Sequence, residues 1–239
     1  MIFASGSCRL LTSIETRAIG HDLLHSLKRN FIGANFLGKY HNTKQHIQFI
    51  EWLLYKKELP MDICERFFTV NNDMSRNIKD NINYLKKREI IRNKFEQCDV
   101  FIFEICSIKV YECDGYQVQH ELIESEKKVH VYEQTEDDIA KDLNYLINLI
   151  PTSKKIIFQC HFRPNIIKNS DKYIIPNREI IFKTLKSFCD KNNFICHDPS
   201  IMLKQDPTLY DGDTHFLQRG LLSNCKKLVE LIDAKKTIE

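Results

Sequence analysis

The sequence predicts an α/β fold, in which helices cover both faces of a doubly wound parallel sheet. Four short runs are hydrophobic throughout rather than at every second residue, which is typical of strands buried on both sides. Between and after them lie segments with the 3.6-residue period of amphipathic helices. Strands that alternate with helices indicate parallel strands joined by helical crossovers. Because no linker, repeat or low-complexity segment interrupts the 239 residues, we expect a single domain, residues 1–239.

The predicted elements are spread along the whole chain. The strands are Met1 to Ser5, Val100 to Ile105, Lys155 to Cys160 and Phe194 to His197. The helices are Gln45 to Tyr55, Met74 to Phe95, Asp137 to Ile150, Arg178 to Asn192 and Gly220 to Ala234. Thr135 and Asp138 have the spacing of a capping box at the start of the third of these helices.

Residues 109–133 fit neither pattern. Val118, His120 and Leu122 alternate with polar residues, as do Val129 and Val131. Such alternation indicates half-buried strands. We therefore expect a hairpin appended to the sheet, as an edge feature or as a lid.

The composition is that of an ordinary globular protein, with 43% hydrophobic and 28% charged residues. The net charge of +3 arises from 35 basic and 32 acidic residues that are mixed along the chain. This mixture argues against a nucleic-acid partner, since nucleic-acid binders concentrate their positive charge. The longest apolar stretches fall short of the roughly 20 residues that a membrane span needs, so we expect no membrane association.

The nine cysteines are odd in number and include no Cys-x-x-Cys pair, and several lie inside apolar runs. Buried reduced cysteine behaves as a small hydrophobic residue, and reducing compartments keep it free. Met1 to Phe3 is already part of the first predicted strand, so we expect no targeting peptide ahead of the domain. These observations predict a cytoplasmic protein without a disulfide framework.

In an open parallel sheet, ligands bind outside the carboxyl ends of the strands. The first predicted strand ends at Gly6-Ser7-Cys8, where glycine allows a sharp turn into a helix. The free amides and the dipole at the start of that helix favour an anion and lower the pKa of a thiol. This turn is therefore a candidate nucleophile site. The alternative is that Ser7 only caps the helix and that Cys8 only fills space.

A second motif, Asp211-Gly212-Asp213-Thr214-His215, lies just before the last predicted helix. A histidine can take the proton of a nucleophile, and a carboxylate can hold the imidazole in the required tautomer. The alternative is an ordinary surface histidine.

The order of these two motifs resembles that of the SGNH (GDSL-like) hydrolases. Gly6-Ser7-Cys8 looks like the variant block of the GSCFA family and of the capsule-biosynthesis WcbI-like proteins. Gly33-Ala34-Asn35 and Tyr40-His41-Asn42-Thr43 look like the second block of such proteins. The resemblance implies a flavodoxin-like sheet of the SGNH-hydrolase type. It also implies an acyl-ester hydrolase or acyltransferase that works through a covalent acyl-enzyme, on a glycan or another polyhydroxyl substrate.

The resemblance assigns roles at the catalytic centre. Alignment with the Gly-Asp-Ser turn of the family places Cys8 at the nucleophile position, with Ser7 as the fallback. His215 is then the base. The acid of the family precedes this histidine by three residues, where this chain has Gly212, so that either Asp211 or Asp213 orients the imidazole.

The asparagine-bearing block of the family is replaced by Cys106-Ser107, so the oxyanion hole needs other donors. The candidates are the Cys8 amide, Gly33, Asn35 and Ser107. Removing one such donor typically costs roughly 2.7 to 4 kcal/mol of transition-state stabilisation.

His161 and Arg163 follow the third predicted strand and are candidates for binding an anionic substrate group, such as the phosphate of an acyl carrier. The alternative is a loop histidine and a solvated arginine. Acyl-CoA is a candidate donor, no cofactor is required, and the sequence carries no signal for an oligomeric state.

Two other classes of function compete with acyl transfer. A catalytically inactive SGNH-like module that binds a glycan or a protein partner is favoured by the altered acid spacing and the missing asparagine. A metal-dependent hydrolase would use His161, His215 and the aspartates, but these two histidines are not closely spaced ligands in the sequence. We therefore expect no metal site.

Overall fold

The computed structural model describes residues 1–15, 31–33, 39–68, 82–119, 129–151, 153–212 and 215–234. Its main sheet has five strands, all parallel, in the order β2-β1-β3-β7-β8. This is the flavodoxin-like order, in which the chain winds outward from the first strand in both directions. The doubly wound α/β fold is therefore confirmed. The strands are β1 (Ile2–Ser5), β2 (Phe31–Gly33), β3 (Val100–Ile105), β7 (Lys155–Cys160) and β8 (Ile195–His197).

Four of the five strands coincide with the predicted apolar runs. The edge strand β2 was not predicted, because its three residues are too few to show a pattern. The helices are α1 (Cys8–Glu15), α3 (Thr43–Leu53), α4 (Met61–Phe67), α5 (Ile82–Glu96), α6 (Glu136–Asn148), α7 (Pro164–Lys168), α8 (Pro176–Asn192), α9 (Pro199–Gln205) and α10 (Gln218–Asp233). All five predicted helices are present, although residues 74–81 lie outside the described part. The capping box of α6 is confirmed, with Thr135 accepting from the Asp138 amide.

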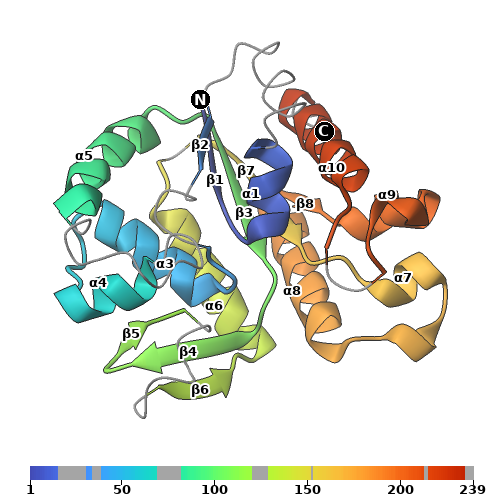
Figure 1. Ribbon diagram of the computed structural model, residues 1–239, viewed down its shortest axis with the longest axis horizontal. Coiled ribbons are helices and arrows are strands. Elements are labelled where there is room, and N and C mark those ends of the chain that lie inside the picture. Colours follow the sequence, from blue (N-terminus) through green and yellow to red (C-terminus); the bar gives the residue numbers. More distant parts are fainter. Residues whose placement is uncertain are drawn as a thin grey trace.

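Both faces of the sheet are buried, but by different kinds of side chain. Helices α1 and α10 cover one face, and α3, α5, α6 and α8 pack on the other (Figure 1). Successive residues of a strand point to opposite faces, so Ile102 contacts α1 and α10 while Phe101 and Phe103 enter the second core. The first core is mainly aliphatic. The second is built on stacked aromatic rings, including Phe3, Tyr40, Phe49, Trp52, Phe95 and Phe158.

The predicted hairpin is present as a separate antiparallel sheet in the order β5-β4-β6. Its strands are β4 (Lys109–Cys113), β5 (Tyr116–Gln117) and β6 (His130–Glu133), and residues 120–128 lie outside the described part. Helix α3 holds this sheet through the amides of Gln45 and Gln48, which donate to the carbonyls of Val118 and Gln117 at 2.9 Å each. The segment is therefore a small sheet of its own that is fastened to α3, and not a hairpin appended to the edge of the main sheet.

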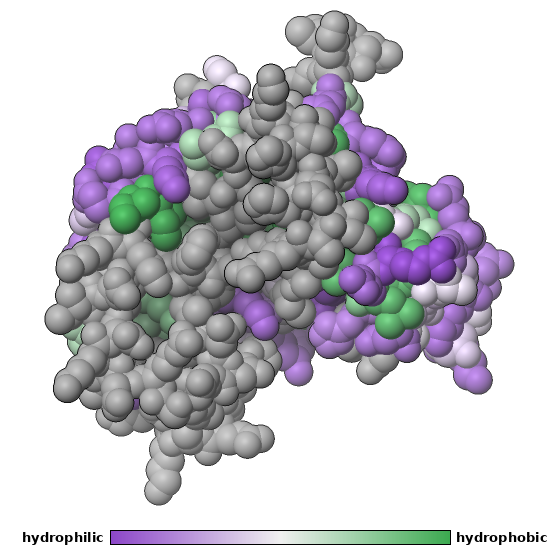
Figure 2. Space-filling model, turned by 45° about the horizontal axis from the view of Figure 1, so that its top comes forward, coloured by the Kyte–Doolittle hydropathy of each residue, from purple (hydrophilic) through white to green (hydrophobic). Residues whose placement is uncertain are grey.

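The described surface is mostly polar. Among the coloured residues in the view of Figure 2, hydrophilic ones cover more area than hydrophobic ones, which form small separate areas. Within the described residues no helix is long and apolar enough to cross a membrane.

Candidate active site

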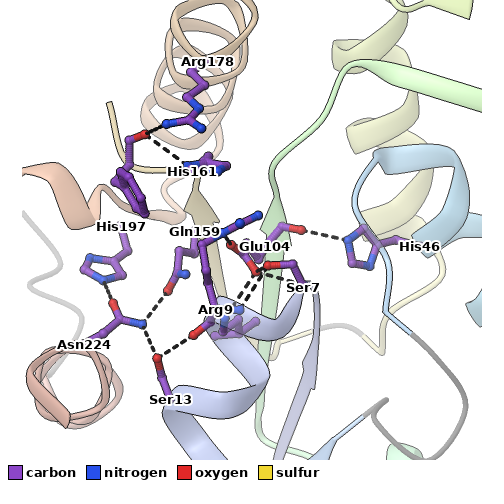
Figure 3. A network of polar contacts seen from close by, with 12 residues as sticks. Ser7, Arg9, Ser13, His46, Glu104, Gln159, His161, Arg178, His197 and Asn224 are labelled. Carbon is purple, nitrogen blue, oxygen red and sulfur yellow. Dashed lines mark hydrogen bonds and ion pairs between the residues drawn. The ribbon is translucent and has the colours of Figure 1, made fainter. Parts of the chain in front are cut away.

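A row of polar side chains crosses the sheet near its carboxyl edge, on the face that α1 and α10 cover. Glu104 of β3 pairs in register with Gln159 of β7, which in turn pairs with His197 of β8. All three residues are buried. A buried polar group needs a partner, and here helices α1 and α10 supply the partners. Figure 3 shows the resulting network around Glu104 and Asn224.

Glu104 is the centre of a group that we call the α1 corner, made of Gly6, Ser7, Cys8, Arg9 and Glu104. The Glu104 carboxylate is fully buried and accepts four hydrogen bonds. Its Oε2 atom accepts from the Ser7 amide at 2.9 Å, the Ser7 hydroxyl at 2.6 Å and the Leu10 amide at 3.3 Å. Its Oε1 atom accepts from Arg9 Nε at 3.1 Å. The carboxylate thus occupies the amino end of α1.

Gly6 makes this arrangement possible. A Cβ atom at this position would lie 2.6 Å from Glu104 Cβ and 3.1 Å from Leu10 Cδ2. The turn between β1 and α1 can therefore approach β3 only because residue 6 has no side chain.

The two candidate nucleophiles differ in their surroundings. Ser7 is fully buried, and its hydroxyl donates to Glu104 and accepts from the Arg9 amide at 3.2 Å. Cys8 is the first residue of α1, and its side chain lies outside the described part of the structure. The Ser7 hydroxyl is therefore enclosed and engaged in two hydrogen bonds.

His161 lies directly after β7 and is only 6% exposed. Its Nδ1 atom is 3.1 Å from the Phe162 carbonyl, which also accepts from Arg178 Nη1 at 3.1 Å (Figure 3). A carbonyl only accepts hydrogen bonds, so Nδ1 carries the proton and Nε2 has the lone pair. Burial, followed by the charges of Arg9 and Arg178, lowers the pKa of His161 from 6.5 to about 2. This imidazole is therefore neutral at physiological pH.

His215 belongs to a tight loop, which we call the histidine loop (Tyr210–Gly212 with His215 and Phe216). The Asp211 amide donates to the His215 carbonyl at 3.0 Å, and the His215 amide donates to Asp211 Oδ1 at 3.1 Å. His215 Nδ1 lies 3.6 Å from Asp211 Oδ2, and the imidazole is 59% exposed. The structure therefore places Asp211 beside the imidazole, while Asp213 lies outside the described residues.

The α1 corner and the histidine loop both lie at the carboxyl end of β7: Glu104 pairs with Gln159 of that strand, and Tyr210 and Phe216 of the loop pack against the Phe162 ring, two residues beyond it. Both Arg9 of the corner and His215 of the loop are close enough to His161 to lower its pKa. The first strand and the last loop, more than 200 positions apart, are thus brought to the same carboxyl edge of the sheet.

The other predicted site residues have structural contacts of their own. The Ser107 amide donates to the His41 carbonyl at 2.9 Å, and the Ser107 hydroxyl accepts from the Lys109 amide at 3.0 Å. An oxyanion role for that amide is therefore disfavoured. Gly33 ends β2 beside Ala4, and Asn35 lies outside the described part.

Arg163 is bound by protein carboxylates. It pairs with Asp198 at 2.7 Å and with Glu179 at 3.0 Å, and its guanidinium stacks on the Phe182 ring. Two carboxylates more than balance its charge, so the geometry favours a structural role over the predicted binding of a substrate anion. Asp198 also caps α9 by accepting from the Ser200 amide.

Sequence reasoning missed Glu104, Arg9 and Asn224. Asn224 of α10 accepts from His197 Nε2 at 2.8 Å and donates to Ser13 of α1 at 3.1 Å. One signal was available: Glu104 interrupts an otherwise apolar strand, and a buried charge requires a partner. In the described part, no group of three or more His, Cys, Asp or Glu side chains could hold a metal ion.

Comparison with known proteins decides the family. The model of the TviD N-terminal domain matches residues 1–127 of the 239. This chain belongs to the TviD N-terminal domain family. The matched part of this TviD-family protein contains the whole α1 corner, and the histidine loop follows outside it. No curated protein matches the chain.

Solved structures show the fold. A member of the lipolytic protein G-D-S-L family from Veillonella parvula is 12% identical and superposes with a TM-score of 0.51 over 98% of both chains. A GDSL-like lipase from Parabacteroides merdae is 13% identical (TM-score 0.47, 96% of this chain and 93% of that one). A variant of an acetyl-xylooligosaccharide esterase from Geobacillus stearothermophilus is 14% identical (TM-score 0.44, 98% and 94%). The first of these shows that the TviD-family chain has the SGNH (GDSL-like) fold, and the narrower GSCFA or WcbI-like branch stays a prediction.

Proposed function

We propose that this chain is an acyl-ester hydrolase or acyltransferase that forms a covalent acyl-enzyme on Cys8. The observation that carries the proposal is that the α1 corner and the histidine loop both lie at the carboxyl end of β7, beside Gln159 and Phe162, on the edge where parallel sheets bind ligands. The fold shared with a G-D-S-L family protein supports the same reaction class. Ser7 is the fallback nucleophile, and its enclosed hydroxyl makes it the weaker candidate.

In the proposed reaction the Cys8 sulfur attacks the carbonyl carbon of an ester or thioester. His215 removes the thiol proton and, as the C–O or C–S bond breaks, gives it to the leaving oxygen or sulfur. Water or an acceptor hydroxyl then attacks the acyl-cysteine and passes its proton to His215. The acyl–sulfur bond breaks, and the thiolate recovers the proton from His215. Asp211, whose Oδ2 atom lies 3.6 Å from Nδ1, is the carboxylate that we propose to orient the imidazole.

The charge that develops on the carbonyl oxygen requires donors. We propose the Cys8 amide at the start of α1 and the Gly33 and Asn35 region after β2 for this role. His161 offers an acceptor at Nε2, which suits a substrate hydroxyl rather than an anion. A hydroxyl-rich acceptor such as a glycan agrees with this chemistry and with the WcbI-like resemblance. Acyl-CoA is the donor that we propose to test first, and the reaction requires no cofactor.

The test is adduct formation with two acyl donors. The protein is incubated with p-nitrophenyl acetate and with acetyl-CoA, and acetylated peptides are mapped by mass spectrometry. We expect an adduct on Cys8 that is absent in Cys8→Ala, strongly reduced in His215→Ala and retained in Ser7→Ala. An adduct that survives Cys8→Ala and disappears in Ser7→Ala would move the nucleophile to Ser7. Release of the acyl group to glycerol or a sugar, in competition with water, distinguishes transfer from hydrolysis.

The second candidate is a binding module without catalysis. The engaged Ser107 amide and the 3.6 Å separation of His215 from Asp211 favour it. It predicts that neither donor forms an adduct and that the variants behave as the parent does.

A further inference from the structure

The α1 corner contains one group that the proposed reaction leaves without a role, the buried carboxylate of Glu104. We infer that Glu104 is a positioning residue that holds Cys8 at the carboxyl edge of the sheet. The inference rests on the proposed function, because it takes Cys8 as the attacking residue. Three features carry it: the contacts on either side of Cys8, the rigid strand behind the carboxylate, and the pairing with Arg9.

Both chain neighbours of Cys8 are attached to the same carboxylate. Before it, Ser7 donates from its amide at 2.9 Å and from its hydroxyl at 2.6 Å. After it, Arg9 donates from Nε at 3.1 Å and Leu10 from its amide at 3.3 Å. The backbone that carries Cys8 is therefore fixed from both sides by one side chain.

The carboxylate itself has no freedom to move. Glu104 lies on the central strand β3, and its neighbours Phe103 and Ile105 are fully buried in the aromatic core. β3 is paired along its whole length with β7, where Glu104 lies opposite Gln159, and from Val100 to Phe103 with β1. The missing side chain of Gly6 leaves just enough room for the contact, at 2.6 Å from a hypothetical Cβ. A reacting group is held most precisely by partners on such rigid elements.

The two carboxylate oxygens have separate partners. Oε2 accepts from Ser7 and Leu10, and Oε1 accepts from Nε of Arg9, whose side chain is 11% exposed. A carboxamide has a single oxygen. In Glu104→Gln the NH₂ group must therefore face the donors of either Ser7 or Arg9, and two donors then oppose each other. In Glu104→Gln/Arg9→Gln this conflict disappears, because the carboxamide oxygen of residue 9 can accept from that NH₂ group.

The experiment compares these two variants with a matched control. The control is Glu179→Gln, which removes another largely buried carboxylate from its arginine partner, Arg163 on the β7 side. Each protein is checked for folding by near-ultraviolet circular dichroism. The measurements are kcat and KM for p-nitrophenyl acetate, and the rate at which iodoacetamide alkylates Cys8. Peptide mapping separates Cys8 from Cys106 and Cys196, which are also partly accessible.

We expect Glu104→Gln to lower kcat by about 10- to 100-fold, because small misplacements of a reacting group have effects of this size. KM should stay within about threefold of the parent value, and Cys8 should be alkylated no more slowly. The double variant should recover most of kcat, and Glu179→Gln should keep it. If Glu104→Gln does not fold, Glu104→Leu/Arg9→Met takes its place, because it leaves no unpaired buried charge; the same loss of kcat is expected.

Two results would count against the inference in different ways. A folded Glu104→Gln with parental kcat and only a lower melting temperature would reduce Glu104 to a structural residue. Absence of acyl turnover in the parent protein would instead contradict the proposed function itself.

Discussion

The α1 corner and the histidine loop are held by very different means. The corner is buried and fixed by four hydrogen bonds to one carboxylate on a central strand. The histidine loop closes through contacts of Asp211 and His215 and packs the buried rings of Tyr210 and Phe216 against Phe162, while its imidazole is 59% exposed. The two regions therefore differ in how they hold the proposed catalytic groups: a buried carboxylate fixes the backbone at the proposed nucleophile, whereas the imidazole of the proposed base extends into solvent. Changes at the corner should affect both stability and activity, and loss of the exposed imidazole should affect activity alone.

Acid should produce the largest effect, through two buried histidines that lie near the α1 corner. Burial lowers the pKa of His46 from 6.5 to about 4, and that of His161 falls to about 2. Between pH 6.5 and 4 the unfolded chain binds a proton at each residue that the folded chain does not. The free energy of unfolding should then fall with pH by about 1.4 kcal/mol per unit for each histidine.

Urea unfolding of the parent and of His46→Gln at pH 7, 6 and 5 measures this dependence. Glutamine can keep both contacts of His46, with Ser5 and with the Glu104 carbonyl. In the variant, the free energy of unfolding should fall less steeply with pH, because the contribution of His46 is removed. Equal slopes would mean that His46 is not held neutral by the fold.

Replacement of the exposed His215 tests the histidine loop. His215→Ala should lower kcat for p-nitrophenyl acetate by about 10²- to 10⁴-fold, the usual contribution of a general base. Its melting temperature should match that of the parent, because the side chain is mostly exposed. A lower melting temperature would show that the loop is more firmly packed than its contacts indicate.

Gly6→Ala should disturb the packing of the α1 corner against Glu104. The added methyl group would lie 2.6 Å from Glu104 Cβ, on a strand that cannot shift. Overpacking of this kind costs about 1–3 kcal/mol. We expect lower values for both the urea midpoint and kcat. A loss of kcat without a change of midpoint would show that activity at the α1 corner does not depend on its stability.

Asp211→Asn should have the smallest effect. An exposed ion pair contributes about 0–1 kcal/mol, which corresponds to a loss of at most about fivefold in kcat. Asp213→Asn is the matched variant two positions along the chain. A larger loss in Asp213→Asn than in Asp211→Asn would identify Asp213 as the residue that orients His215.

The sequence was sufficient to predict the elements that have a clear hydrophobic pattern. Val100–Ile105 and Lys155–Cys160 are observed with the predicted bounds, since strands buried on both faces are apolar throughout. Short elements escaped prediction for the opposite reason. The edge strand β2 and helix α7, of three and five residues, contain too little sequence for a pattern to appear.

The site was predictable only where residue type alone indicates chemistry. Ser7, His161 and His215 were singled out because they follow strands or precede a helix, and they do lie at one edge of the sheet. Arg163 belonged to the same prediction, but its carboxylate partners come from distant segments that the sequence does not connect to it. Glu104 was missed because position 104 reads only as part of a strand until β3 is placed beside α1.

Glu104 also has an evolutionary consequence. In a Gly-Asp-Ser turn the acid sits inside the turn itself, at the position that Ser7 occupies here, whereas this chain brings its acid from position 104. If both positions carried an acid, two carboxylates would face each other in the same buried space. If neither did, the hydrogen-bond donors at the start of α1 would have no acceptor. Among relatives, positions 7 and 104 should therefore change together, so that exactly one of the pair carries an acid. Such covariation would trace the ancestry of the corner more faithfully than overall identity does.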